Sequence, residues 1–139
     1  MRERRQFAAA LACLRGVGLR PTRQRLALAR LLFDQMARHV SAEQLHAEAV
    51  AAHVPVSLAT VYNTLHQFTA AGLLREVVVE AGRSYFDTNT SQHHHFYHEE
   101  SGSLQDIAAS ELCVSALPAA PGGTTIARVD VIVRLRNGR

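Results

Sequence analysis

Four of the eight histidines in this 139-residue chain lie within one six-residue run, His93-His94-His95-Phe96-Tyr97-His98. If the run forms a β-strand, alternate side chains share a face. His93 and His95 then project together, about 7 Å apart along the strand, while His94 points to the other side. Two imidazoles at that spacing can bind one metal ion, especially where carboxylates lie nearby. We therefore predict a metal site that includes His93 and His95.

A second group of polar side chains lies on the segment that follows Ser57. At helical spacing Thr60, Asn63 and Gln67 share one face, with Tyr62 beside them near the start of the helix. Such side chains hydrogen-bond base edges or contact thymine methyl groups when the N-terminal part of a helix enters the major groove of DNA. An ordinary solvated helix face has the same composition, so these residues alone leave both interpretations open.

Apolar spacing and capping residues predict the elements that hold this helix. One helix is expected over 3–15, and further helices begin after Thr22, Ser41 and Ser57, the last of them ending at Gly72. The predicted apolar stripe of the second helix consists of Leu28, Leu31, Leu32 and Met36. Two strands, 75–79 and 83–87, then form a hairpin. A helix-turn-helix followed by a hairpin is a winged helix.

The remainder of the chain forms a smaller second lobe. Residues 87–92 are polar and unpatterned, so we place a hinge there. The elements expected beyond it are strands over 93–98 and 103–107, a short helix over 109–117 and a strand over 126–136, in which apolar and charged side chains alternate. A lobe of this size buries little core by itself, and self-association would supply the missing cover.

Charge is unevenly distributed along the chain. Residues 1–38 contain nine Arg and two acidic residues, whereas 39–139 contain six Arg and ten acidic residues. A basic first third favours a polyanion-binding domain joined to a different module, although a solvated, Arg-rich helix face gives the same count. The predicted fold class is α+β, with a winged-helix DNA-binding domain over 1–86, a hinge over 87–92 and an α/β dimerisation domain over 93–139.

Composition argues against several other classes of protein. With 47% hydrophobic and 19% charged residues, the chain has a globular rather than a disordered composition. No apolar run approaches the roughly 18–20 residues that a membrane span needs, and no export signal is visible. Two cysteines, Cys13 and Cys113, are too few for a disulfide-held secreted scaffold. We expect a cytoplasmic protein with no membrane partner.

Three motifs follow one another along the chain. They are Leu19-Arg20-Pro21-Thr22-Arg23-Gln24-Arg25, then Ser57-Leu58-Ala59-Thr60-Val61-Tyr62-Asn63-Thr64-Leu65, then Phe86-Asp87 with the run His93–His95. In order and spacing they resemble the Fur superfamily of metal-responsive repressors over nearly the whole chain. The triple histidine followed by Phe96, together with the ending Val129–Arg136, is most similar to the iron response regulator (Irr) branch.

The resemblance implies that a homodimer binds AT-rich palindromic operators, and it leaves a tetramer open. It implies thymine contacts for Tyr62 and a minor-groove contact for Arg20, where Arg suits the negative potential of narrow AT tracts. Asn63 stands where many iron-sensing members have Arg, and Asn pairs with adenine rather than guanine, so we expect the preferred operator to differ. The predicted DNA-contacting residues are Arg20, Thr22, Arg23, Arg25, Ser57, Thr60, Tyr62 and Asn63.

The resemblance also implies a regulatory metal site. The ligands of peroxide-sensing relatives match His39, Asp87, His93, His95 and Asp106, with no gap in the spacing. Three imidazoles and two carboxylates without a thiolate suit Fe(II) or Mn(II) and also accept Zn(II). Because the set spans the predicted hinge, a bound metal would fix the angle between the two domains and so between the recognition helices of a dimer.

Other ligands of the superfamily fit this chain less well. His98 and Ser101 stand where members with a structural zinc carry Cys-x-x-Cys, so we predict no structural zinc site made of four cysteines. The Irr branch implies haem as the signal, but neither cysteine is followed by proline, as the haem motif of some members requires. The haem candidate is therefore the histidine run, with imidazole as an axial ligand. Its members are His93, His94 and His95.

These observations give a leading function and two alternatives. The leading interpretation is a DNA-binding transcriptional regulator of iron homeostasis that responds to haem or to Fe or Mn status. The first alternative is a repressor in which the bound metal senses peroxide. The distant alternative is a metal-dependent hydrolase, but Asp87 and Asp106 are taken as ligands and leave no general base, so we expect no enzyme. Target operator, physiological signal and the direction of the ligand's effect on DNA binding stay open.

Overall fold

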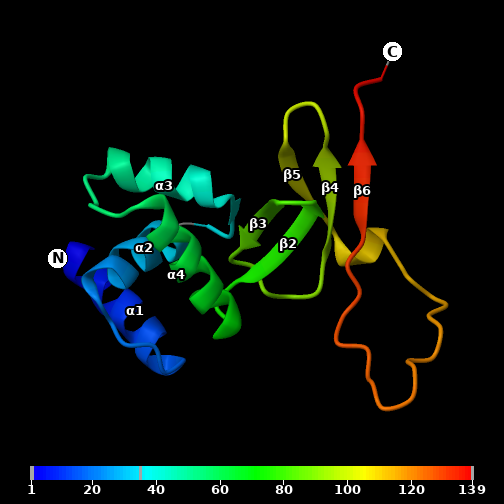
Figure 1. The fold of residues 1–139 in the computed structure, drawn as a ribbon, viewed down its shortest axis with the longest axis horizontal. Coiled ribbons are helices and arrows are strands. Elements are labelled where there is room, and N and C mark those ends of the chain that lie inside the picture. Colours follow the sequence, from blue (N-terminus) through cyan, green and yellow to red (C-terminus); the bar gives the residue numbers. More distant parts are fainter. Residues whose placement is uncertain (1, 35, 139) are drawn as a thin grey trace. The chain divides into compact units, whose positions relative to one another are not determined.

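Figure 1 presents a computed structural model of the chain, which describes residues 2–34 and 36–138. The chain divides into two compact units, Met1–Thr90 and Ser91–Arg139, each with its own small β-sheet. Within the described residues, no helix combines the length and the apolar character that a membrane crossing requires.

Four helices lie in the described part of the first unit: α1 (Arg2–Gly16), α2 (Arg23–Phe33), α3 (Ala42–Ala51) and α4 (Leu58–Ala70). The predicted caps Thr22, Ser41 and Ser57 are confirmed, because each hydroxyl oxygen accepts a hydrogen bond of 3.1–3.2 Å from the backbone N–H three residues later. These bonds satisfy amide groups that have no partner within the helix. After α4, Gly72 takes a φ of 85°, which is typical of the residue that ends a helix.

The helices of the first unit enclose an apolar core. Leu28 and Leu32 of the predicted apolar stripe are fully buried in it. The core residues that α3 and α4 contribute are Leu45, Ala49, Val61, Leu65 and Phe68, which are also fully buried. Leu31 is only partly buried. The prediction for Met36 is wrong, because α2 ends at Phe33 with Asp34 as its C-cap and leaves Met36 89% exposed.

The sheet of the first unit is antiparallel, with strands in the order β1 (His39–Val40), β3 (Arg83–Asp87) and β2 (Arg75–Glu80). The predicted hairpin is confirmed, although β2 extends to Glu80 and leaves a two-residue turn in which Gly82 has a φ of 73°. Strand β1 was not predicted, because two residues carry no periodicity. Its pairing with β3 sets His39 opposite Asp87.

The sheet of the second unit has strands in the order β5 (Ser103–Ile107), β4 (His94–His98) and β6 (Ile132–Leu135). Strand β4 runs antiparallel to β5 and parallel to β6. The predicted pairing of the histidine strand with its neighbour is therefore confirmed, with His93 immediately before the strand. Tyr97, Leu104 and Ile107 are buried in this unit.

Two predicted elements of the second unit are wrong in extent. The helix expected over 109–117 is only a 3-10 turn, η1 (Ala109–Glu111), and residues 112–131 contain neither helix nor strand. The strand expected over 126–136 is reduced to β6. Within the described residues β6 pairs only with β4, and that pairing begins at Ile132. Residues 126–131 have alternating apolar and charged side chains, but in the described part of the chain they have no neighbouring strand to pair with and form no strand.

Leu65 tests the helical core of the first unit. Its side chain is fully buried, so Leu65→Ala leaves a cavity, and we expect the free energy of unfolding to fall by about 2–5 kcal/mol. Val78→Ala is the control, because Val78 is 60% exposed on β2 and its truncation is expected to change stability by about 0.5 kcal/mol or less. Denaturant unfolding followed by circular dichroism measures both, and equal losses would contradict the assignment of Leu65 to the core.

Candidate functional site

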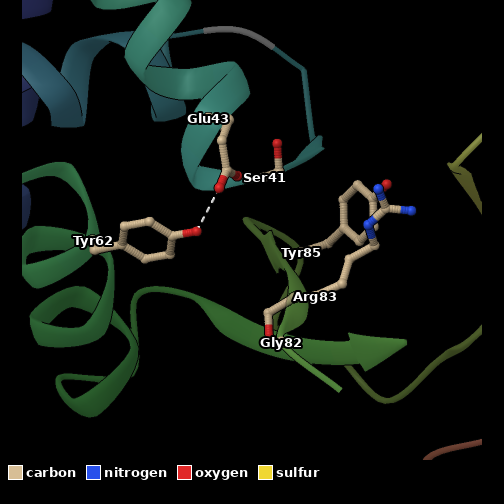
Figure 2. A pocket seen from close by; sticks show the side chains of 7 residues that line it. Ser41, Glu43, Tyr62, Gly82, Arg83 and Tyr85 are labelled. Atoms are coloured by element: carbon tan, nitrogen blue, oxygen red, sulfur yellow. Dashed lines mark hydrogen bonds between the residues drawn. The ribbon is translucent and has the colours of Figure 1, made fainter. Parts of the chain in front are cut away.

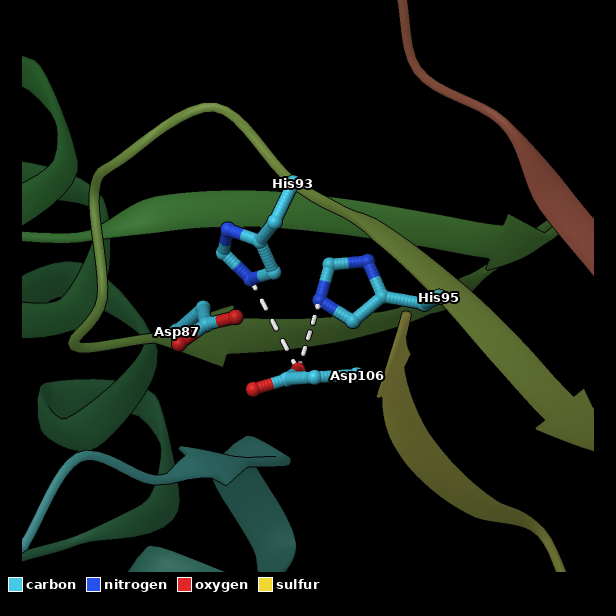
Figure 3. Close-up of side chains that lie close together, drawn as sticks. All are labelled: Asp87, His93, His95 and Asp106. Carbon is cyan, nitrogen blue, oxygen red and sulfur yellow. Dashed lines mark ion pairs between the residues drawn. The ribbon is translucent and has the colours of Figure 1, made fainter. Parts of the chain in front are cut away.

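The histidine run meets an acidic residue of the neighbouring strand. His95 and Asp106 are partners across the β4–β5 pair. The Oδ1 atom of Asp106 lies 3.3 Å from Nε2 of His95 and 3.6 Å from Nε2 of His93. The two imidazole rings meet edge to face with their centroids 4.6 Å apart, and Figure 3 shows both turned toward the carboxylate. Three of the five predicted metal ligands therefore converge within the second unit.

Hydrogen bonding at His93 determines which ring nitrogen faces the carboxylate. Its Nδ1 atom lies 2.7 Å from the carbonyl oxygen of Ser91, and a carbonyl oxygen only accepts, so Nδ1 carries a proton. In the neutral ring, Nε2 then directs a lone pair toward Asp106, whose carboxylate oxygen is also an acceptor. Such a pair needs a cation, either a second proton on the ring or a metal ion. Metal-binding histidines typically donate their other N–H to a carbonyl or carboxylate in this way.

The separations of the candidate ligand atoms also fit a metal ion. Imidazole nitrogen and carboxylate oxygen bind zinc at about 2.0–2.2 Å, which sets neighbouring ligand atoms of a tetrahedral site about 3.4 Å apart. The 3.3 and 3.6 Å separations lie on either side of that value, and the ligand atoms of His93, His95 and Asp106 all lie within 4.8 Å of one another. Both imidazoles are buried, whereas the Asp106 side chain is 49% exposed, so solvent reaches the carboxylate.

His94 has a different environment from its two neighbours. Its Nδ1 atom accepts a 3.1 Å hydrogen bond from the backbone N–H of Val131, and the side chain is buried. It thereby ties β4 to the segment that leads into β6. The predicted haem candidate therefore separates into His93 and His95, which face Asp106, and His94, which supports the sheet.

The two other predicted ligands belong to the first unit and are cross-strand partners. His39 of β1 is paired with Asp87 of β3, and residues directly opposite each other in an antiparallel pair have neighbouring side chains. The ring of His39 also meets that of Tyr85 edge-on, with 6.5 Å between centroids. The backbone N–H of Arg38 donates to Oγ1 of Thr88, and the backbone N–H of Thr88 donates to the carbonyl of Arg38, each at 2.9 Å. These two bonds fix the register of the strands beside the pair.

Arg38 holds the short strand β1 against two helices. Its guanidinium donates two hydrogen bonds to the carboxylate of Glu48 on α3, at 2.9 and 2.5 Å, and one of 3.3 Å to the carbonyl of Leu31 on α2. A bidentate pair of this kind has a defined geometry as well as favourable charge. Arg38 therefore positions His39. It was not predicted, because its contact with Glu48, ten positions away on another element, leaves no local pattern in the sequence.

A polar hollow of about 420 Å³ lies between the start of α2 and one side of α4. Five of the eight predicted DNA-contacting residues line it, whereas Arg23 and Ser57 lie outside its lining and Tyr62 lines a different hollow. The complete lining consists of Arg20, Thr22, Gln24, Arg25, Thr60, Asn63, Thr64 and Gln67. Hydrogen-bond donors and acceptors from two helices thus share one recess.

Arg25 connects the two sides of this hollow. Its Nε and Nη2 atoms donate to Oε1 of Gln67 at 3.3 and 3.0 Å, and Nη1 donates to the Arg20 carbonyl at 2.8 Å. These contacts fix the loop before α2 relative to α4. Thr22 and Ser57 use their hydroxyl oxygens as caps of α2 and α4, so both also position the helices that carry their neighbours.

Tyr62 lies in a second hollow, beside the hairpin. Its hydroxyl donates a 2.6 Å hydrogen bond to Glu43 in the first turn of α3, as Figure 2 shows. This bond lowers the pKa of the Glu43 carboxyl and raises the pKa of the Tyr62 hydroxyl. The hollow measures about 450 Å³ and is lined by Ser41, Glu43, Tyr62, Gly82, Arg83, Ser84 and Tyr85. Glu43 was not among the predicted site residues, since no local pattern links it to a tyrosine 19 positions away.

Both cysteines are free thiols. Cys13 is partly buried on α1, where burial raises the pKa of its thiol, and Cys113 is exposed after η1. In the part of the chain that the structure describes, neither belongs to a group of three or more potential metal ligands.

The chain is similar in sequence to known proteins. The model of the ferric uptake regulator family matches residues 16–131. The ferric uptake regulation protein of Cupriavidus metallidurans is 37% identical over 83 residues, which cover 60% of this chain and 58% of that protein. The peroxide-responsive repressor PerR of Staphylococcus aureus is 34% identical over 103 residues, which cover 73% of this chain and 68% of that protein. The chain thus spans 54–58% of the length of three ferric uptake regulation proteins that it matches.

Solved structures share the mixed helix-and-sheet fold. The ferric uptake regulator of Pseudomonas aeruginosa, solved with manganese, superposes with a TM-score of 0.71 over 94% of this chain and 98% of its own, at 24% identity. The ferric uptake regulator of Vibrio cholerae gives a TM-score of 0.70 over 90% and 97% of the two chains, at 22% identity. At these identities the similarity establishes the fold.

Asp106→Asn tests the candidate metal site. The substitution keeps the size of the side chain but removes its charge, so we expect the affinity for Mn(II) to fall by at least about tenfold. Isothermal titration calorimetry on the metal-free chain measures this. Glu111→Gln on η1 removes the same charge from an exposed position outside the cluster and should leave the affinity unchanged. An equal fall in both variants would contradict a ligand role for Asp106.

Proposed function

The chain belongs to the ferric uptake regulator family, and on that premise we propose that it is a metal-responsive transcriptional regulator that binds DNA and has no catalytic role. The observation that carries the proposal is the convergence of His93, His95 and Asp106, with Nε2 of His93 directed at a carboxylate oxygen. This arrangement favours a cation, and it consists of nitrogen and oxygen ligands that first-row divalent ions accept.

The proposed ion is Fe(II) or Mn(II), with Zn(II) as a competitor. In this proposal His93, His95 and Asp106 hold it, and His39 and Asp87 of the first unit complete the set. The absence of thiolate ligands and the cross-strand pairing of His39 with Asp87 support this choice. The regulator of the same fold from Pseudomonas aeruginosa was solved with manganese. When bound, the ion supplies positive charge that draws its ligands together.

We further propose that 1–86 form the DNA-binding domain, 87–92 the hinge and 93–139 the dimerisation domain. An ion with ligands on both sides of the hinge would restrict its bending. The two DNA-binding domains of a homodimer would then keep one separation, and a palindromic operator requires such a fixed spacing of its half-sites. The direction of the metal's effect on DNA binding follows from this fixed spacing. Metal binding is expected to promote operator binding.

The polar hollow beside α4 supports the DNA-binding part of the proposal. Arg20 and Arg25 supply positive charge at its rim, and Asn63 can bond an adenine through its amide. The excess of Arg in residues 1–38 adds the non-specific attraction to phosphates. The proposed target is an AT-rich palindromic duplex bound by a homodimer, with Tyr62 and Asn63 among the base-contacting residues.

Two finer versions of this function differ in the signal. A peroxide-sensing repressor is favoured by the similarity to PerR of Staphylococcus aureus, since the same His and Asp ligands would hold an oxidisable Fe(II). A haem-responsive, Irr-like regulator would use the histidine run. We favour the metal ion over haem, because Nδ1 of His94 accepts from Val131 and only His93 and His95 face Asp106.

The metal requirement can be tested by fluorescence anisotropy with a labelled AT-rich palindromic duplex and the metal-free full chain at fixed salt. We expect weak binding that Mn(II) strengthens at least about tenfold, in keeping with usual allosteric couplings. His95→Ala should abolish this response, because the variant lacks a buried ligand. His98→Ala, the same change on the same strand but in a residue bonded to Gln105, should retain it.

Other results would select another version of the function. Tight binding by the metal-free chain that haem abolishes would contradict activation by metal and support the Irr-like version. Loss of binding on treatment with peroxide, seen only in the Fe(II)-loaded chain, would support the peroxide-sensing version. Equal affinity for the palindrome and for a scrambled duplex under every condition would contradict a transcriptional regulator.

Asn63→Ala tests base readout from the polar hollow. Loss of the amide is expected to weaken operator binding by about 1–3 kcal/mol and to leave the affinity for a scrambled duplex unchanged. Gln44→Ala removes a similar amide from the exposed side of α3, away from the hollow, and serves as the control. Anisotropy titrations with both duplexes measure the difference. An equal loss on both duplexes would show that Asn63 contacts only the backbone of DNA.

A further inference from the structure

The hydroxyl group of Tyr62 has a fixed hydrogen-bonding role. Its Oη atom donates to Oε1 of Glu43 at 2.6 Å, a bond between α4 and α3 that Figure 2 draws as a dashed line. A tyrosine hydroxyl has one proton to donate, and an ionised carboxylate can only accept. While this bond persists, the oxygen of Tyr62 keeps lone pairs but has no proton for another partner. Toward any other molecule Tyr62 is therefore an acceptor.

Several features keep Glu43 ionised and so keep it an acceptor. The hydrogen bond from Tyr62 lowers the pKa of the carboxyl most, and the backbone N–H of Glu43 and the positive charge of Arg83 lower it further. The carboxylate also lies in the first turn of α3, where the positive end of the helix dipole favours a negative charge. The same hydrogen bond raises the pKa of Tyr62, so the hydroxyl stays protonated.

Resting on the proposed function, in which α4 reads DNA, we propose that Glu43 is a specificity-determining residue that makes Tyr62 a hydrogen-bond acceptor toward the bases. Glu43 acts through Tyr62 and is thus a positioning residue. Its carboxylate requires no contact with DNA for this role, and it lies beside the hydroxyl on the side of α4 that faces the hairpin.

The consequence for readout follows from the chemistry of the major groove. Adenine N6 and cytosine N4 carry amino protons that an acceptor can bind, whereas guanine N7 and O6 and thymine O4 are acceptors themselves. At a thymine the ring of Tyr62 can still contact the methyl group, whereas its acceptor-only hydroxyl favours an amino group at the base edge that it meets. It is unfavourable opposite guanine, where two acceptors would face each other, and the adjacent negative charge of Glu43 adds to that penalty.

The opposite side of α4 has different chemistry. There Arg25 and Asn63 line the polar hollow and present N–H donors as well as acceptors. Helix α4 would then read an operator half-site with two sides. The side at the polar hollow offers hydrogen-bond donors, and the side of Tyr62 offers only an acceptor. Glu43 accounts for this difference, because without its carboxylate the proton of Tyr62 becomes available to DNA.

The contact itself is testable without DNA. Carbon NMR of the Cζ atoms of the three tyrosines, followed during an alkaline titration of the full chain, reports each pKa, and Tyr62→Phe identifies the signal of Tyr62. In Glu43→Ala we expect the pKa of Tyr62 to fall toward its ordinary value, because the charged acceptor is gone. Because Glu43 is exposed, its truncation leaves the core intact. An unchanged pKa would overturn the proposal.

The effect on readout is tested with the Mn(II)-loaded full chain and a set of duplexes that carry each of the four bases at every position of the bound site. We expect Glu43→Ala to raise the relative affinity for guanine at one position by about fivefold, the effect of one hydrogen bond. In a Tyr62→Phe background the same substitution should have no such effect. Glu80→Gln removes one negative charge from the hairpin, where Glu80 lies 3.8 Å from Arg83, and it leaves both partners of the Tyr62–Glu43 hydrogen bond in place. This control should change the affinity for all duplexes alike.

Different failures have different meanings. If Glu43→Ala strengthens binding to every duplex by one factor, Glu43 acts only through its charge and the proposal is overturned. A guanine-specific gain that persists in the Tyr62→Phe background also overturns it, because Tyr62 is then not the mediator. A wild-type chain that binds all duplexes equally would instead overturn the proposed function, and this proposal with it, whatever the tyrosine titration gives.

Discussion

Lone pairs on imidazole nitrogens and on a carboxylate oxygen repel one another unless a cation lies among them. In the second unit this requirement is set by the backbone, because the β4–β5 register pairs His95 with Asp106 and the Ser91 carbonyl fixes the proton of His93 on Nδ1. The fold thus holds the ligand atoms 3.3–3.6 Å apart, a separation that suits a shared metal ion.

The first unit contributes a second prearranged pair and a surface for DNA. The pair of His39 and Asp87 depends on the two-residue strand β1. Arg38, the residue before this strand, holds it in place through its hydrogen bonds to Glu48. Helix α4 then divides its polar residues between two hollows with different chemistry. In the proposed function, the ion controls how two copies of α4 are presented, while Asn63 and Tyr62 read the sequence.

Features that depend on neighbouring residues were predictable from the sequence, and features that depend on distant pairing were not. The caps Thr22, Ser41 and Ser57 follow from local backbone chemistry, and the spacing of His93 and His95 follows from the two-residue period of a strand. The Arg38–Glu48 and Glu43–Tyr62 contacts join separate elements and leave no local pattern. The strand expected over 126–136 fails over its first six residues, because alternation alone does not supply a partner strand.

The central claim is that one divalent ion binds among His93, His95 and Asp106. Anomalous X-ray diffraction from crystals of the Mn(II)-loaded chain, recorded on both sides of the manganese absorption edge, tests it most directly. The account predicts one strong peak within bonding distance of Nε2 of both histidines and of a carboxylate oxygen of Asp106. A peak elsewhere, or none at this position in fully loaded crystals, would contradict it.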